Sequence, residues 1–223
     1  MWNKYRHVTV LLLGDRLASK GTAMARIFLG LLLCAALGGT PLATADDGPD
    51  APLSVIRPFP SRGTIQMQLT GGDYSIRAAD TDQIHVTGTA DYPYQQKNLR
   101  ADVEIRGTAA TIVTSGPHNN THFTIEVPRR SNLRIRLQAG DIQVERIEGD
   151  LDISSHAGDV NVEVPRASDY RSVDASVYAG DLNAPAFGGG KDGLFRSIHW
   201  TGSGVYRLRA HVGAGELNLE TAE

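Results

Sequence analysis

A short repeated step, Gly-Asp followed by alternating apolar residues, constrains this chain more than any other feature. Ala-Gly-Asp occurs three times, and a further Gly-Asp pair lies between the first two copies. The aspartates are Asp141, Asp150, Asp159 and Asp181; the first three are nine residues apart, and the last follows 22 residues later. Self-similarity at a fixed spacing is typical of architectures in which similar units stack on one another.

Apolar and polar residues alternate through most of the chain from Thr64 onward, beginning with Ile65, Met67 and Leu69. A period of two is typical of half-buried strands, and no window carries a convincing helical stripe. We therefore predict an all-β fold, built as a single-chain parallel β-helix-like solenoid with coils of about 18–22 residues. A sandwich of hairpins is the alternative, but residues 133–182 contain no Asn-Gly or Asp-Gly two-residue turn.

The glycines of the repeat are predicted to be structural corners between strands. They are Gly140, Gly149, Gly158 and Gly180. Glycine adopts positive φ without steric cost, and a following aspartate can accept a hydrogen bond from the backbone two residues on. Glycine and aspartate together therefore suit a tight corner.

Calcium binding is the alternative interpretation of the repeated acids, because the nine-residue spacing resembles that of calcium-binding β-rolls. The candidate ligands are Asp141, Asp150, Asp159 and Asp181. Each repeat, however, has one glycine before its aspartate and a hydrophobic residue directly after it. Calcium requires six to eight oxygen ligands, so the structural corner is the favoured interpretation and no cofactor is predicted.

Residues 1–45 have the pattern of a secretory signal peptide. The apolar run Ile27–Gly39 follows Arg26 and leads to a small-x-small site, which predicts cleavage after Ala45. Met24 is an alternative start of translation, in which case residues 1–23 are not translated. Thirteen apolar residues are fewer than the roughly 20 needed to span a bilayer. We expect an exported protein of the periplasm, cell surface or extracellular medium, with no membrane span after cleavage.

The chain after the leader is divided into a tether and one domain. Residues 46–61 contain four prolines and are predicted to be a Pro-rich tether, and residues 62–223 the solenoid domain. The single cysteine, Cys34, lies in the leader, which excludes a disulfide framework. The leader holds five basic residues and one acid, so residues 46–223 carry 17 basic and 24 acidic residues, a net charge of −7. This acidity disfavours nucleic acid and anionic lipid as partners.

Few residue patterns point to catalysis. The nucleophile motif Gly-x-Ser-x-Gly is absent from the sequence. Asp150 and Asp152 are two apart on a predicted strand and share one face, a geometry that a polysaccharide-active β-helix enzyme can use. Phe195, Trp200 and Tyr206 gather in the last predicted strands. They form either a cap on the core or a patch that contacts sugar or protein.

Several stretches match the pattern of one family. They are residues 63–65 and 72–76, Val127-Pro128 before Leu133, the Ala-Gly-Asp repeats, and residues 193–198 and 206–217. Together they resemble the putative-adhesin domain family of exported bacterial proteins, over roughly residues 55–220. The resemblance implies a β-solenoid without known catalytic activity. We expect a non-catalytic cell-envelope protein that binds or scaffolds, with an envelope protein or a surface glycan as partner. An envelope-stress sensory accessory module is the alternative, and a polysaccharide-active enzyme the second.

Overall fold

The computed structural model describes residues 51–222, except the side chains of residues 190–193. The elements are almost all strands, so the all-β prediction is confirmed. The strands are β1 (Leu53–Pro58), β2 (Thr64–Gly71), β3 (Asp73–Ala79), β4 (Gln83–Ala90), β5 (Arg100–Arg106), β6 (Ala109–Ser115), β7 (Thr121–Pro128), β8 (Asn132–Ala139), β9 (Ile142–Glu145), β10 (Leu151–Ala157), β11 (Val160–Val164), β12 (Tyr170–Ala184), β13 (Gly189–Thr201), β14 (Tyr206–Ala214) and β15 (Leu217–Thr221). Three short helical segments are α1 (Pro93–Gln96), η1 (Ala167–Asp169) and η2 (Pro185–Phe187). Among these residues no helix is long and apolar enough to cross a membrane.

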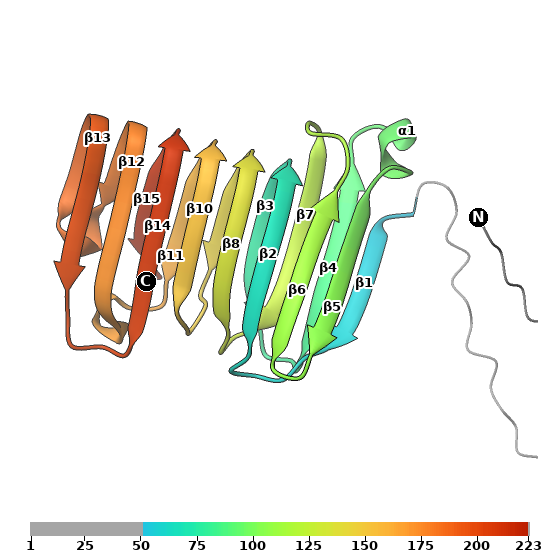
Figure 1. Ribbon diagram of the computed structural model, residues 1–223, viewed down its shortest axis with the longest axis horizontal. Helices are drawn as coiled ribbons and strands as arrows, with labels where there is room; N and C mark the ends of the chain where they lie inside the picture. The colour runs from blue at the N-terminus through green and yellow to red at the C-terminus, as the bar shows by residue number, and fades with distance from the viewer. Residues whose placement is uncertain (1–50, 223) are drawn as a thin grey trace, which may run out of the picture. The chain divides into compact units, whose positions relative to one another are not determined.

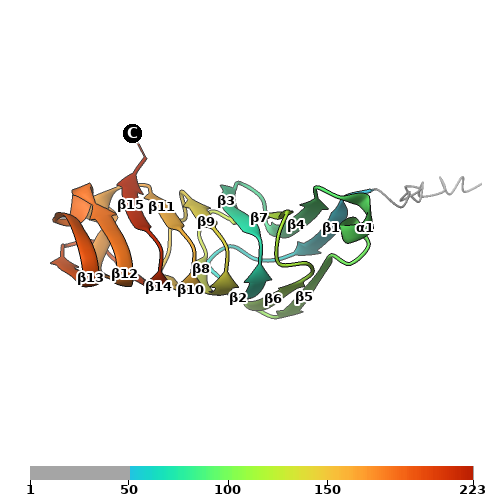
Figure 2. The ribbon, with the colours of Figure 1, turned by 90° about the horizontal axis from the view of Figure 1, so that it is seen from above.

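The strands form two layers of one mixed sheet (Figures 1 and 2). In hydrogen-bonded order, layer A contains β5, β6, β2, β8, β10, β14 and the first part of β12. Layer B contains β1, β4, β7, β3, β9, β11 and β15. Strand β12 is 15 residues long and pairs first with β14 and then, through Leu182 and Asn183, with β15. It therefore joins the layers at one end, where β13 pairs with it, and the sheet is nearly closed around the core.

The predicted single-chain parallel β-helix is wrong, because the sheet is mixed and its strands are out of chain order. Antiparallel pairs lie toward the ends: β1–β4 and β4–β7, β5–β6, and β12–β13. The last two strands of the chain, β14 and β15, lie between the β10–β11 unit and β12. An 18-residue step does relate β8 to β10, where Leu133 pairs with Leu151. The Ala-Gly-Asp step specifies a corner within a two-strand unit, but it does not specify which unit stacks next.

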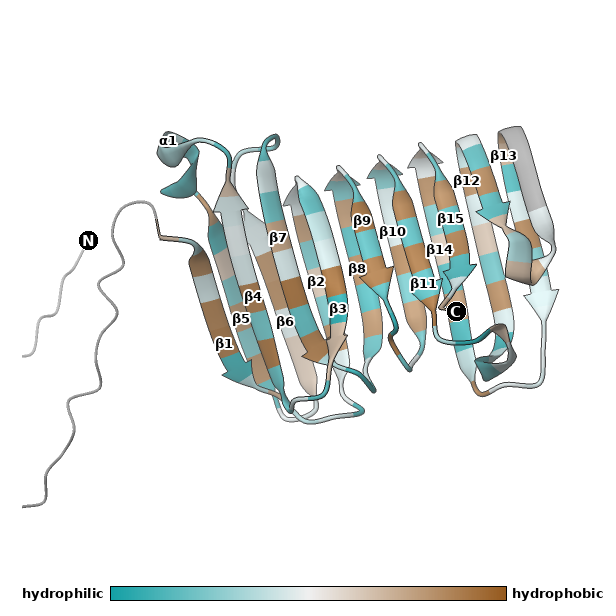
Figure 3. Ribbon diagram, turned by 180° about the vertical axis from the view of Figure 1, so that it is seen from behind, coloured by the Kyte–Doolittle hydropathy of each residue, from teal (hydrophilic) through white to brown (hydrophobic). Residues whose placement is uncertain are grey.

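The core lies between the two layers and consists of the apolar residues of the alternating pattern, visible as brown bands in Figure 3. Met67, Ile135, Ile153 and Ala210 form one row across four neighbouring strands, and all four are fully buried. Since successive side chains of a strand point to opposite faces, the residues between them form rows on the outer face of each layer. These outer rows are the available binding surfaces.

Strand β1 occupies part of the stretch predicted to be a tether. It is the edge strand of layer B and pairs with β4 from Leu53 to Pro58. One of the four prolines, Pro58, is the last residue of this strand. Proline is tolerated on an edge strand, since its missing N–H can face solvent, so it does not exclude a strand there. Residues 46–50, the predicted signal peptide and its cleavage site after Ala45 lie outside the described residues.

Candidate functional site

Glycines form a ladder along the edge where strands of layer A pass into strands of layer B. Gly140, Gly158 and Gly180 have φ angles of 119°, 109° and 132°. A Cβ atom on Gly158 would lie 2.0 Å from the carbonyl oxygen of Gly140. Gly149, before β10, does not have a positive φ, but a Cβ there would lie 2.0 Å from the carbonyl oxygen of Ser131. Close approach of neighbouring backbones therefore excludes a side chain at these positions.

The four calcium candidates are divided between two edges. Asp141, Asp159 and Asp181 follow the glycine ladder, whereas Asp150 precedes β10 at its other end. Asp141 Oδ1 accepts a hydrogen bond from the N–H of Asp159 at 3.0 Å, and Asp159 Oδ1 accepts one from the N–H of Glu216 at 2.9 Å. These carboxylates tie one unit to the next. Within residues 51–222 no group of three or more His, Cys, Asp or Glu side chains could hold a metal ion.

The outer face of layer A carries ion pairs between its neighbouring strands. Asp152 of β10 lies between Arg134 and Arg136 of β8, with N–O distances of 3.3 and 3.1 Å. Asp150 accepts hydrogen bonds from the backbone N–H and Nη2 of Arg207 at 2.8 and 3.3 Å. Desolvation raises the pKa of Asp152, but the hydrogen bond and charge of Arg136 and the charges of neighbouring arginines outweigh it. The pKa of Asp152 is therefore held below its ordinary value.

Asp150 and Asp152, the carboxylate pair considered for polysaccharide cleavage, do share this face. A glycosidase needs one carboxyl group whose pKa is raised, so that it can donate a proton to the leaving group. The pKa of Asp152 is lowered instead, and the carboxylate of Asp150 accepts a hydrogen bond from the guanidinium of Arg207. The arrangement suits the pairing of adjacent strands better than proton transfer.

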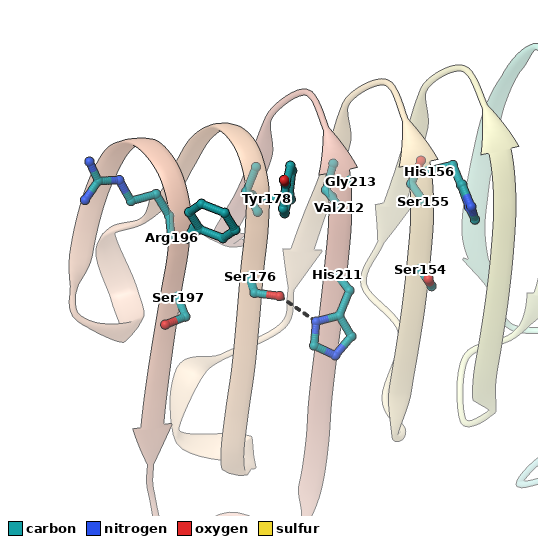
Figure 4. Close-up of a pocket in the computed structure, with 12 residues that line it drawn as sticks. Ser154, Ser155, His156, Ser176, Tyr178, Arg196, Ser197, His211, Val212 and Gly213 are labelled. Atoms are coloured by element: carbon teal, nitrogen blue, oxygen red, sulfur yellow. Dashed lines mark hydrogen bonds between the residues drawn. The ribbon is translucent and has the colours of Figure 1, made fainter.

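An open, shallow hollow of about 490 Å³ lies on the same face, where β10, β14, β12 and β13 run side by side (Figure 4). Its lining includes Ser154 and His156 from β10, His211 and Gly213 from β14, Ser176 and Tyr178 from β12, and Phe195 from β13. They alternate with residues of the core, such as the buried Val177 and Val212. The hollow is therefore built on outward positions of a rigid sheet.

Ser176 and His211 are in direct contact in this hollow, with 2.6 Å between Oγ and Nδ1 (Figure 4). In enzymes with a nucleophilic serine, a histidine beside the serine acts as the general base, and a third group orients the histidine. In the described part of the chain, no carboxylate contacts His211. The pair therefore offers hydrogen-bonding groups rather than an activated nucleophile.

The predicted cluster of late aromatic residues is divided between the core and the surface. Trp200 packs on Phe187 with ring centroids 5.2 Å apart, and Tyr206 packs on a buried tyrosine of β12 at 6.0 Å. Both rings help to close the core at this end. Phe195 instead is 70% exposed and contacts Tyr178, which is 60% exposed; their centroids are 4.7 Å apart and their planes meet at 76°.

Several residues of the hollow were missed in the sequence. Tyr178 lies between Val177 and Ala179, so the alternation itself places it on the outer face. Gly213 and His211 become neighbours of Tyr178 only because β14 pairs with β12, a pairing that no local pattern predicts.

No protein-family model and no curated protein matches the chain. Among solved structures it is similar to a putative cell adhesion protein from Clostridium sporogenes, with 12% identity, a TM-score of 0.49, and coverage of 77% of this chain and 100% of that chain. It is also similar to a putative adhesin from Bacteroides fragilis, with 10% identity, a TM-score of 0.23, and coverage of 75% and 96%. A putative lipid binding protein from Parabacteroides distasonis matches with 12% identity, a TM-score of 0.22, and coverage of 77% and 97%. Two of these names agree with the predicted resemblance, but likenesses at this level assign neither family nor function.

Proposed function

We propose that the chain is a non-catalytic binding protein of the cell envelope, exported by the predicted signal peptide. It recognises an envelope protein or a surface glycan with the outer face of layer A. The observation that carries this proposal is the exposed ring pair Tyr178–Phe195 beside an open hollow. Aromatic side chains are enriched at binding surfaces, since they bury a large contact area at a low cost in conformational entropy.

The chemistry of the face supports binding rather than catalysis. Asp152 of β10 and Asp150 just before it are paired with arginines, and the described lining of the hollow contains no carboxylate. Tyr178 stands on β12, which is hydrogen-bonded on both sides, so its position is set before a partner arrives. Such preorganisation lowers the entropic cost of binding.

The experiment that tests this proposal compares two matched tryptophan variants of the tagged full chain, cross-linked in the envelope of its native host. Ser154→Trp adds a bulky side chain to the outer face of layer A. Ser75→Trp adds the same side chain at a half-buried outward position of β3, on the outer face of layer B. We expect Ser154→Trp to lower recovery of the cross-linked component at least tenfold and Ser75→Trp to leave it unchanged. Equal recovery with both variants, or a loss only with Ser75→Trp, would refute the choice of face.

A further inference from the structure

The hollow on the outer face of layer A has the features of a sugar site. We propose that it binds a neutral pyranose ring of a glycan, with Tyr178 as the platform on which the ring stacks. This inference rests on the proposed function and names the ligand class of the same face. A pyranose presents a face of C–H bonds and a rim of hydroxyl groups, so its site must combine a flat apolar surface with adjacent hydrogen-bonding groups.

The platform is held in place before a ligand binds. The ring of Phe195 stands nearly perpendicular to that of Tyr178, at a centroid distance of 4.7 Å, and restricts its movement. Phe195 itself has a φ of 56°, a left-handed conformation that is costly for a residue other than glycine. Strained residues of this kind gather at ligand sites. Both rings remain mostly exposed, so a large apolar area is available to a ligand.

Space beside the platform comes from Gly213. Val212 pairs with Val177 on one side and with Ser155 on the other, so Gly213 lies between Tyr178 and His156 in the same outward row. A Cβ at Gly213 would lie 2.4 Å from the carbonyl oxygen of His156, which explains the glycine. Two strand spacings of about 4.8 Å separate the backbones of Tyr178 and His156. One ring, with van der Waals contacts of about 3.5–4.0 Å, fits beside Tyr178.

Uncharged polar groups surround this space. Ser176 and His211 form a hydrogen-bonded pair, and Figure 4 shows them below Tyr178 on neighbouring strands. The hydroxyl of Ser154 has no hydrogen-bond partner among the described residues, and neither does the second ring nitrogen of His211. These groups can donate to and accept from sugar hydroxyls.

The charge of the lining favours a neutral ring. No Asp, Glu or Lys side chain belongs to the described lining. Arg196 is the one arginine of the described lining, and Figure 4 shows its guanidinium directed away from Tyr178 and Ser176. The geometry also disfavours other occupants. A peptide added as a strand needs a free sheet edge. Such an edge exists on β13, but β12 and β14, which carry Tyr178 and Gly213, are paired on both sides. A lipid chain needs a deeper apolar cavity.

The test measures binding of single sugars to the protein purified from its native host. Methyl glycosides of glucose, galactose, mannose and N-acetylglucosamine are titrated by saturation-transfer difference NMR, with methyl glucuronide as the anionic comparison. For a ligand this small we expect at least one neutral glycoside to bind with a roughly millimolar Kd. Tyr178→Ala should weaken that binding at least tenfold, and Tyr178→Phe, which keeps the ring, should change it less than about threefold.

The matched control is Tyr94→Ala. Tyr94 lies in α1, is 66% exposed and stacks on Tyr92. Because α1 connects β4 to β5, which lie far from β12 in the sheet order, its loss should leave sugar binding unchanged. The inference is overturned if no neutral glycoside binds, if Tyr178→Ala binds like wild type, if Tyr94→Ala loses as much, or if the glucuronide binds best. If sugars fail but cross-linking still depends on Ser154 and not on Ser75, the proposed function stands and the sugar site falls. If Ser154→Trp and Ser75→Trp do not differ in cross-linking, and Tyr178→Ala and Tyr94→Ala do not differ in sugar binding, the proposed function and the sugar site are both refuted.

Discussion

Replacing Gly158 by alanine tests whether close backbone contact at the glycine ladder holds the two-strand units together. The added Cβ would lie 2.0 Å from the carbonyl oxygen of Gly140, well inside the ordinary contact distance, at a φ of 109°. Such a φ costs a residue with a side chain on the order of 1–3 kcal/mol. Relief of the overlap requires the two units to separate, which lengthens the hydrogen bond from the Gly140 N–H to the carbonyl oxygen of Ala157, now 3.1 Å. Losing one or two such bonds costs about 0.5–1.5 kcal/mol each.

Together these costs give a loss of about 1.5–6 kcal/mol in the free energy of unfolding. Since 1 kcal/mol shifts Tm by about 2–4 °C in a domain of this size, Tm should fall by at least about 3 °C. Urea unfolding followed by circular dichroism measures the loss directly. Gly107→Ala is the control for strain alone, because Gly107 has a φ of 62° and no atom within 4 Å of a new Cβ; we expect a loss of about 1–2 kcal/mol. If Gly158→Ala destabilises no more than Gly107→Ala, the contact argument is wrong.

Three further predictions concern the core, the outer face and the ladder. Ile135→Ala should lower the free energy of unfolding by about 2–5 kcal/mol in the same urea assay, because the side chain is fully buried in the central row. The pKa of Asp152 is lowered in the folded protein, so its contribution to stability is present above the unfolded pKa of about 3.9 and is lost as the pH falls through the folded pKa. Asp152→Asn should therefore flatten the decline of stability with pH below about 4, and an unchanged decline would show that Arg136 does not stabilise the charge. Asp159→Ala removes the acceptor for the N–H of Glu216 and should cost about 1 kcal/mol, whereas Asp159→Asn, which keeps an oxygen, should cost less.

Part of this fold follows from local patterns in the sequence. The alternation of Ile65, Met67 and Leu69 predicts a half-buried strand, and all three side chains are buried in β2. The period depends only on the backbone, since successive side chains of any strand point to opposite faces. The sequence therefore predicts which residues of a strand face outward, and Tyr178 is one of them.

The order of the strands could not be predicted in the same way. Units with matching corners pair equally well by local criteria, so the choice between neighbours depends on the connections and the ends of the sheet. Residues 80–131 contain β4 to β7, which pair at one end of the sheet and allow β2 to lie directly beside β8. The prolines in and around β1 likewise indicate a tether until the place of β1 at the edge of layer B is known.

The departure from chain order is also what creates the candidate site. If the units stacked in chain order, β12 would lie directly beside β10. Tyr178 and His156 would then be neighbours in one outward row, separated by one strand spacing of about 4.8 Å. Two large side chains would then fill the row. The insertion of β14 between them, with Gly213 at this position, moves Tyr178 and His156 two spacings apart and leaves a space without a side chain. The hollow therefore depends on the last unit of the chain lying inside the stack, and its ligand should stabilise the pairing of β14 with both neighbours.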